Sequence, residues 1–448
     1  MHILKLGTNY YIMLKNILLR SSLMVIVSFM VLLSASCTNG VDESVNPRMG
    51  YRDLGATGLR VSEIGIGCGP FEDMSPEESR AYMDVALDSG INYIDIYDAN
   101  PLVRSNIGYA LKDRRDRMII QGHVGCFWNG TSYERTRNRQ QAERGFSDLL
   151  DLLGTDHIEV GMLHIVDKMD EWDTILNSQL MDYLRQLKQE GKVQHIGMSS
   201  HNVDVAMAAA KSGEFEVIMF SMNPAFDRLT SDHNPWEKDA EMLPGIDPKR
   251  VEFYDYCTQH HIAITNMKTF GGGGRLLKAD QSPLGFALTP TQCIAYCLSK
   301  PCCAVAIAGA STIEQLQEDL HYLTATDQEK DFNSVLQRGV ADAYTNEAGN
   351  QCGPESATVK AAASVNGNQC TYCNHCAPCP VGIDIGKVNK LLDQARGKNP
   401  VPEQVKKEYE ALEHHAGECI GCAQCEERCP FSVPVRERMQ EAVKVFGK

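Results

Sequence analysis

The sequence predicts an α/β protein, a (β/α)₈ barrel followed by a small cysteine-rich domain. Short apolar runs alternate with amphipathic helical patterns eight times over roughly 270 residues, the expected size of such a barrel. Beyond the last repeat, eight of the 17 cysteines fall between Cys370 and Cys429. A second domain of different composition therefore follows the barrel.

The expected strands are short and mostly apolar. They are Glu63–Gly67, Tyr93–Tyr97, Met118–Val124, Ile158–His164, His195–Ser199, Val217–Ser221, Ile262–Met267 and Ala304–Ile307. The helical pattern after the first strand has Pro76 at its start and Gly90 just past its end, as helix termini prefer. A doubly wound open sheet is the alternative, but GIGCGP at 65–70 lacks the GxGxxG spacing of that fold.

Length and charge limit the classes of function. The 448 residues have room for two or three domains, and a 43% hydrophobic content suits a globular protein. A net charge of −15 argues against nucleic acid as a partner, because phosphate backbones are bound by basic surfaces.

The N-terminal residues 1–37 have the pattern of a signal peptide. Lys15 and Arg20 precede the apolar run Leu23–Leu33, and LSASC ends at Cys37. LSASC is similar to a bacterial lipoprotein box, with Ser34 where leucine is usual. We expect a lipid anchor on Cys37, a tether at 38–49, and a protein exported to, or anchored at, the bacterial cell envelope. An uncleaved membrane anchor, which leaves the protein on the cytoplasmic face, and a mistaken start codon are the alternatives.

Polar side chains follow the expected strands where a (β/α)₈ barrel carries its chemistry, at the carboxyl ends. These positions hold Asp95, Tyr97, His123, His164, Ser199–His201, Asn223, Lys268, Gly271–Gly274 and Gly309–Ser311. One such residue is usually a satisfied polar group, but a carboxylate, three histidines and a lysine at one rim favour a site.

Six blocks of the sequence resemble, in order, those of the aldo/keto reductase family. They are YRDLGATGLRVSEIGIGCG, GINYIDIYDAN, MLHIVD, VQHIGMSSHN, MKTFGGGGRL and IAGASTIEQLQEDL, and they span residues 51 to about 323. The resemblance implies NAD(P) bound across the C-terminal face of the barrel and a small carbonyl or sugar-like substrate. It also implies hydride transfer, with a tyrosine giving the proton under the influence of a lysine, an aspartate and a histidine.

Two of the four implied catalytic positions are changed. Asp95 and His164 match the family, but Asn100 stands at the tyrosine position and His123 at the lysine position. An amide is no general acid, because it has no usable pKa. We therefore predict that His123 and His164 move the proton, since histidine exchanges protons near neutral pH. Tyr97 and Lys268 are the alternatives.

The nucleotide positions are better kept. Gly309, Ser311 and the helix that begins near Thr312 suit a phosphate, because free N–H groups and the helix dipole meet there. By the resemblance, Ser199 and Asn223 lie near the nicotinamide, and Lys268 matches the subgroup fused to ferredoxin domains. Gln315 stands where NADP-preferring relatives carry arginine, which leaves both NAD and NADP open.

Two cysteine strings occupy the C-terminal part. The first is Cys370, Cys373, Cys376 and Cys379, and the second is Cys419, Cys422, Cys425 and Cys429, each followed by proline. The second string has the spacing of a bacterial [4Fe–4S] ferredoxin, and the first is one residue shorter. Zinc sites usually space two CxxC pairs by a longer loop, and disulfides among such close neighbours are strained.

We therefore predict two [4Fe–4S] clusters in a ferredoxin-like domain at 370–448, after a barrel at 50–326 and a helix and linker at 327–369. In two-cluster ferredoxins the fourth cysteine of each string ligates the other cluster. The sets are then Cys370, Cys373, Cys376 and Cys429 for one cluster, and Cys419, Cys422, Cys425 and Cys379 for the other.

Two functions fit these observations. The first is an oxidoreductase that couples NAD(P)-linked chemistry on a carbonyl or sugar-like substrate to the clusters, with a redox partner protein for single electrons. The second is a membrane-tethered iron–sulfur protein for electron transfer or binding, with a catalytically degenerate barrel. Asn100 and His123 favour the second, and the retained Asp95 and His164 favour the first.

Overall fold

The computed structural model describes residues 48–230, 242–243, 245–343, 370, 372, 374, 376–398, 400–429 and 433–447. The predicted signal peptide, nearly all of the tether, most of the linker and Cys373 lie outside the described residues. Within the described part, no helix is long and apolar enough to cross a membrane.

Eight parallel strands close into a barrel in the order β10-β11-β12-β3-β4-β5-β8-β9. The prediction of a (β/α)₈ barrel is confirmed, and each strand ends within two residues of its expected bounds. The strands are β3 (Ile64–Gly67), β4 (Tyr93–Ile96), β5 (Ile119–Val124), β8 (Ile158–Leu163), β9 (Val193–Ser200), β10 (Val217–Ser221), β11 (Ala263–Met267) and β12 (Cys303–Ala308).

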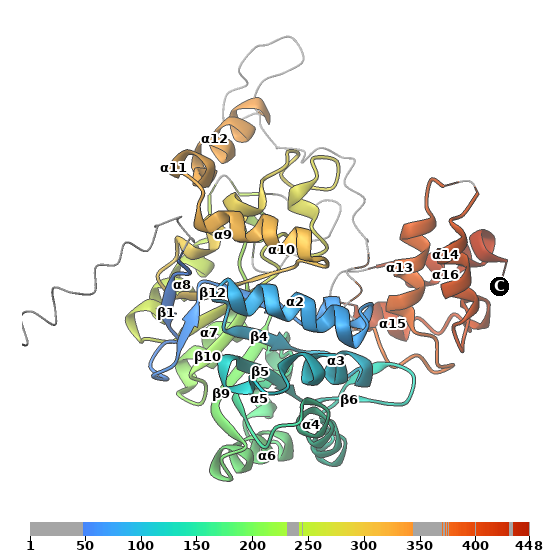
Figure 1. Ribbon diagram of the computed structural model, residues 1–448, viewed down its shortest axis with the longest axis horizontal. Helices are drawn as coiled ribbons and strands as arrows, with labels where there is room; N and C mark the ends of the chain where they lie inside the picture. The colour runs from blue at the N-terminus through green and yellow to red at the C-terminus, as the bar shows by residue number, and fades with distance from the viewer. Residues whose placement is uncertain are drawn as a thin grey trace, which may run out of the picture. The chain divides into compact units, whose positions relative to one another are not determined.

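Helices surround these strands (Figure 1). They are α2 (Pro76–Asp88), α3 (Pro101–Leu111), α4 (Arg139–Leu153), α5 (Met169–Ile175), α6 (Gln179–Gln189), α7 (Val203–Ser212), α8 (Pro248–Gln259), α9 (Pro290–Leu298) and α10 (Ile313–Leu320). Capping residues determine where these helices begin and end. Ser75 and Glu78 close a capping box on α2, and Gly154 ends α4 in the left-handed region at φ 67°.

The barrel is filled by side chains and sealed at its N-terminal end. A hairpin, β1 (Tyr51–Asp53) and β2 (Arg60–Ser62), runs directly into the start of β3. Leu54 of its turn joins Val61 and inward residues such as Val160 and Met219 in one buried apolar cluster. Polar residues of the barrel interior, such as Asp95 and His123, come from later positions in their strands. The N-terminal part of the barrel interior is therefore apolar core, and these polar side chains lie toward the C-terminal end.

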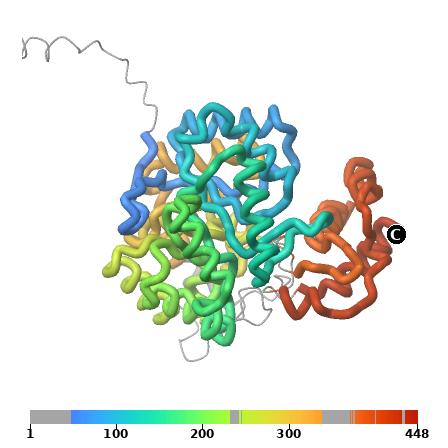
Figure 2. The backbone as a smooth tube through the Cα atoms, turned by 90° about the horizontal axis from the view of Figure 1, so that it is seen from below, coloured from blue at the N-terminus to red at the C-terminus, as the bar shows by residue number. Residues whose placement is uncertain are grey.

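Two further sets of helices follow the barrel. The helix expected after residue 326 is broken at Asp331 into α11 (Asp327–Lys330) and α12 (Phe332–Ala343). The cysteine-rich part contains α13 (Ile385–Ala395), α14 (Glu403–Glu410), α15 (Gln424–Arg428) and α16 (Val435–Phe446). These C-terminal residues, orange to red in the backbone view, form one small group of helices (Figure 2).

Helix α10 carries a buried carboxyl group that is not compensated by a nearby base. Asp319 is 2% exposed, and its Oδ2 has no hydrogen-bond partner within the described part of the chain. Burial, with a smaller contribution from Glu318, raises the pKa of Asp319 to about 8. The folded protein therefore holds this proton where an unfolded aspartate has released it, which couples folding to pH.

Asp319→Asn should make the protein less sensitive to rising pH. Between the ordinary aspartate pKa of about 4 and the folded value near 8, the folded state binds more protons, so wild-type stability falls as pH rises through that window. At pH 8 the variant should be more stable by about 1–3 kcal/mol. Urea unfolding at pH 5 and pH 8 measures this, with exposed Asp88→Asn as the control. Equal pH dependence of the wild type and Asp319→Asn would contradict it.

Candidate functional site

Asp95, His123 and His164 come together at the C-terminal end of three adjacent strands. Asp95 lies on β4, His123 on β5, and His164 directly follows β8; β5 pairs with both β4 and β8. His123 Nε2 lies 3.1 Å from Asp95 Oδ1, and His123 Nδ1 lies 2.7 Å from His164 Nδ1. All three side chains are at most 2% exposed, so their hydrogen bonds form away from bulk water.

Gln121 fixes the carboxylate end of this chain. Its Nε2 donates to Asp95 Oδ1 at 2.6 Å, while its Oε1 accepts from Tyr93 Oη at 2.6 Å and from Thr265 Oγ1 at 3.0 Å. The two donors on Oε1 determine which way the amide points. Asp95 therefore accepts hydrogen bonds from both Gln121 and His123, which offsets the cost of burying a carboxylate.

A tyrosine that sequence reasoning missed stands at the other end. Tyr133 belongs to a hairpin after β5, formed by β6 (Cys126–Trp128) and β7 (Tyr133–Arg135). Its hydroxyl is hydrogen-bonded to His164 Nε2, and the two rings meet edge to face at 5.5 Å. Asn129–Gly130 between two short apolar segments is a hairpin signal that could have revealed this element.

The hairpin is held in place by close packing and by a buried arginine. Gly145 of α4 lies so near β6 that a Cβ atom there would collide with the carbonyl oxygen of Cys126. Arg104 of α3 is fully buried and donates to the carbonyl oxygens of Gly145 at 2.7 Å and Asp98 at 2.9 Å. The position of Tyr133 is thus determined by packing outside the strands of the barrel.

If Asp95 is ionised and both imidazole rings are neutral, the hydrogen-bond partners allow one arrangement of the protons. Asp95 accepts only, so His123 Nε2 carries a proton and its Nδ1, in the neutral ring, accepts. His164 Nδ1 must then donate to His123, which leaves His164 Nε2 to accept the proton of Tyr133. Every donor in this row points toward the buried carboxylate. We call Tyr133, His164, His123 and Asp95 the proton chain.

Asn100 lies outside the proton chain. Its side chain accepts from Leu102 N at 3.0 Å and caps the N-terminus of α3, which is a structural role. Tyr97, the alternative proton donor, lies just past β4, with its ring edge to face with Tyr133 at 6.4 Å. Lys268, the other alternative, has left-handed backbone at φ 62°, and its carbonyl oxygen accepts from Asn223.

Thiol chemistry at this rim is disfavoured. Cys68 follows β3, Cys126 begins β6, and both side chains are buried. Burial raises the pKa of Cys126 to about 11, and burial together with Asp98 raises that of Cys68. Both are therefore thiols near neutral pH, and the thiolate is the reactive form.

The expected nicotinamide residues lie on adjacent strand ends and have partners within the chain. Ser199 Oγ accepts from Ile165 N at 2.8 Å, which leaves its own proton to donate. Asn223 Oδ1 accepts from Ala225 N and Phe226 N, and its Nδ2 donates one proton to Lys268 O at 3.0 Å. A second Nδ2 proton remains, so Ser199 and Asn223 fit the carbonyl oxygen of a carboxamide.

Some N–H groups of the expected phosphate loop already have hydrogen-bond partners within the chain. Gly309 and Ser311 follow β12, and Thr312 caps α10 by accepting from Gln315 N. Gln315 Oε1 accepts from Ser311 N at 2.7 Å. A bound phosphate would have to replace this amide oxygen at Ser311 N, and Gln315 offers no charge to a 2′-phosphate.

The two cysteine strings repeat one backbone conformation. The residue two places after the first cysteine is left-handed in both, Tyr372 at φ 57° and Gly421 at φ 69°. The residue four places after it is also left-handed, Asn374 at φ 52° and Ala423 at φ 63°. Three of these four residues are not glycine, so the same unfavourable turn recurs for a structural reason.

That reason fits a cluster-binding loop. Tyr372 N donates to Cys370 Sγ at 3.3 Å, and such N–H groups stabilise thiolate sulfur at iron–sulfur centres. The third cysteine of each string, Cys376 or Cys425, is buried. Arg428, beside Cys429, donates to the carbonyl oxygens of Cys376 and Pro378, which joins the end of one string to the other. Among the described residues, however, no group of three or more cysteine, histidine or acidic side chains is close enough to hold a metal ion. The two interleaved ligand sets therefore stay a prediction from the sequence.

Comparison with known proteins agrees with both parts of the chain. Residues 63–286, half of its length, match the model of the aldo/keto reductase family. This chain belongs to that family. Residues 369–434 match a 4Fe-4S dicluster domain. The chain is thus an aldo/keto reductase-type oxidoreductase with an iron–sulfur domain, as the sequence predicted.

Similar proteins cover the barrel. An uncharacterised oxidoreductase of Bacillus subtilis, YqkF, is 26% identical over 62% of this chain and 92% of its own length. L-galactose dehydrogenase of Arabidopsis thaliana is 29% identical over 34% of this chain and 49% of its own length. The aldo-keto reductase AKR11C1 of Bacillus halodurans, in its holo form, has a similar fold, with a TM-score of 0.52 and 24% identity over 65% of this chain and 96% of its own.

Pairs of cysteine substitutions should show whether the strings exchange ligands. If Cys429 and Cys376 serve one cluster, Cys429→Ala combined with Cys376→Ala should lose about half of the iron and sulfide. Cys429→Ala combined with Cys422→Ala should lose nearly all of both, because each cluster is then damaged. Iron and sulfide analysis of anaerobically purified protein measures this, with Cys257→Ala as the control. The opposite pattern would assign each string to its own cluster.

Proposed function

We propose that this oxidoreductase interconverts a hydroxyl and a carbonyl group on a small sugar-like substrate, and that its redox chemistry is coupled to the two clusters. The observation that carries the proposal is the proton chain, in which every donor points from Tyr133 toward buried Asp95. Such an arrangement is ready to take a proton, which favours oxidation of the hydroxyl group.

Tyr133 acts as the acid–base residue in place of the tyrosine that Asn100 has replaced. A phenol has the donor chemistry that an amide lacks. Tyr133 reaches His164, the retained family histidine, from the β6–β7 hairpin instead of from the end of β4. The acid is thus still a tyrosine, but it is supplied by the β6–β7 hairpin.

In the oxidative direction, Tyr133 Oη takes the proton of the substrate hydroxyl as its own proton moves to His164 Nε2. His164 Nδ1–H bonded to His123 spreads the resulting positive charge over both rings, and the Asp95 carboxylate balances it. Carbonyl reduction runs the same steps in reverse. Gln121 keeps Asp95 ready as the acceptor in either direction.

Ser199 and Asn223 would hold the carboxamide of NAD(P), and Gly309, Ser311 and Gln315 would contact its phosphates. When bound, the nucleotide accepts or supplies hydride, and each [4Fe–4S] cluster carries one electron at a time. A redox partner protein for single electrons belongs to this proposal. The similarity to L-galactose dehydrogenase supports a sugar-like substrate.

One observation favours the second function, an iron–sulfur electron-transfer or binding protein with a degenerate barrel. Tyr133 is only 1% exposed, so its hydroxyl could fill the place beside His164 that a substrate hydroxyl would take. The two functions make opposite predictions for removal of that hydroxyl group.

Tyr133→Phe should lower turnover roughly a hundredfold, the usual contribution of a general acid or base, with KM nearly unchanged. The variant keeps the ring against His164 and Tyr97 and removes only the proton donor. The assay incubates anaerobic protein with L-galactose and other aldoses, with NAD or NADP, and follows nucleotide and cluster absorbance. Exposed Tyr109→Phe is the matched control.

Higher turnover in Tyr133→Phe would show that the phenol blocks the site and would contradict its role as acid–base residue. If neither nucleotides nor aldoses change either absorbance in the wild type, the second function replaces the first.

A further inference from the structure

The residue that follows His164 has unusual backbone. Ile165 lies in the left-handed region at φ 44°, which is rare for a β-branched side chain. Such a conformation persists where surrounding groups hold it, and it tends to occur at functional sites. The peptide groups on both sides of Ile165 determine the direction in which the His164 ring leaves the end of β8.

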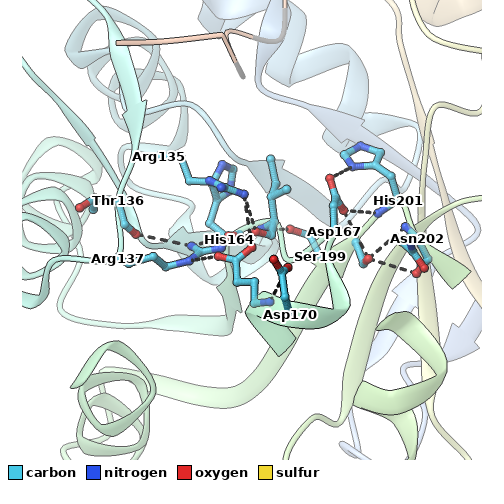
Figure 3. Close-up of polar contacts among 12 residues, drawn as sticks. Arg135, Thr136, Arg137, His164, Asp167, Asp170, Ser199, His201 and Asn202 are labelled. Atoms are coloured by element: carbon cyan, nitrogen blue, oxygen red, sulfur yellow. Dashed lines mark hydrogen bonds and ion pairs between the residues drawn. The ribbon is translucent and has the colours of Figure 1, made fainter. Parts of the chain in front are cut away.

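Arg137 and Ser199 bind all four polar groups of these peptides, three through side chains and one through a backbone carbonyl oxygen. Arg137 Nη1 donates to the His164 carbonyl oxygen at 2.8 Å, and Arg137 Nη2 donates to that of Ile165. Ser199 Oγ accepts from Ile165 N at 2.8 Å, and the Ser199 carbonyl oxygen accepts from Val166 N at 2.9 Å. Figure 3 shows Arg137 and Ser199 near His164.

Arg137 is itself held in one orientation. Its Nε donates to Glu171 Oε1 at 2.6 Å, so the guanidinium directs its remaining donors at the two carbonyl oxygens. Arg135 adds a bond to the Ile165 carbonyl oxygen at 3.2 Å. Arg135 ends β7, and Arg137 lies two residues after it. The segment that carries Tyr133 therefore also carries the two arginines that bind the backbone next to His164.

We infer that Arg137 is a positioning residue that orients His164 toward Tyr133 and His123 by holding Ile165 in its left-handed conformation. The inference rests on the proposed function. It adds that the short segment from Tyr133 to Arg137 supplies both the phenol and the group that aligns the imidazole receiving its proton. The planar guanidinium suits this task, because one side chain can bind two carbonyl oxygens and a carboxylate at once.

The test compares Arg137→Met, Arg137→Lys and Arg139→Met. Arg139, the first residue of α4, lies two residues after Arg137, and its side chain pairs with Glu143 of α4 and Gln186 of α6. Its substitution therefore controls for the loss of an arginine from this segment. Arg137→Met should lower kcat about a hundredfold with KM within twofold, because a small displacement of an acid–base group has that effect. Arg137→Lys should recover part of the loss, and Arg139→Met should stay near the wild type.

Hydrogen–deuterium exchange of the segment around His164–Val166 gives a readout that needs no substrate. Exchange there should be faster in Arg137→Met than in the wild type, and unchanged in Arg139→Met. Wild-type exchange in Arg137→Met would overturn the inference, whatever the activity. Faster exchange with unchanged kcat would also overturn it, because Arg137 would then stabilise the loop without affecting catalysis.

The same comparison separates this inference from the proposed function. If Tyr133→Phe loses turnover and Arg137→Met does not, the proposed function stands and the positioning role is rejected. If Tyr133→Phe keeps full turnover, the proposed function fails first, and the positioning role fails with it.

Discussion

A carboxylate buried at the mouth of the barrel needs donors, and the rest of the candidate site follows from that need. Asp95 meets it with Gln121 and His123, and Gln121 is oriented in turn by Tyr93 and Thr265. With Asp95 ionised and both imidazole rings neutral, His123 donates to Asp95, His164 donates to His123, and Tyr133 donates to His164. One buried charge thus sets the direction of every hydrogen bond along a row of four residues from four elements.

By the sequence resemblance, Asn100 and His123 stand at the expected tyrosine and lysine positions, and the proposed function gives the tasks of those two residues to other side chains. His123, at the expected lysine position, lies between Asp95 and His164. In the proposal the phenol comes from the β6–β7 hairpin that follows β5, and Arg135 and Arg137, in β7 and just after it, bind the backbone beside His164. These changes depend on one another in the proposal: a phenol supplied from a hairpin has to be fastened to the strand whose histidine it contacts.

The barrel and part of the candidate site could be predicted from the sequence, because they depend on hydrophobic periodicity and strand topology. The eight strands were predictable from apolar runs, and the meeting of Asp95, His123 and His164 followed from the rule that parallel strands end at one rim. The role of Tyr133 could not be predicted, because its contact with His164 depends on how the β6–β7 hairpin folds. The hydrogen bonds that the Asn223 and Gln315 side chains accept from backbone N–H groups of nearby residues were not predictable either, since each side chain could instead have faced a ligand.

The cysteine strings show the same division. Their spacing predicted iron–sulfur chemistry, and the match to a 4Fe-4S dicluster domain agrees. The repeated left-handed turns were not predictable, because neither Tyr372 nor Ala423 is a residue that favours such backbone.

The central claim concerns where the protons lie, and imidazole nitrogen NMR of ¹⁵N-histidine-labelled protein, with His123→Gln and His164→Gln for assignment, tests it most directly. The account predicts that His123 is protonated at Nε2 and bare at Nδ1, and that His164 is protonated at Nδ1 and bare at Nε2. A proton on His164 Nε2, with its Nδ1 bare, would reverse the row and leave Tyr133 as an acceptor, which would contradict the proposed function.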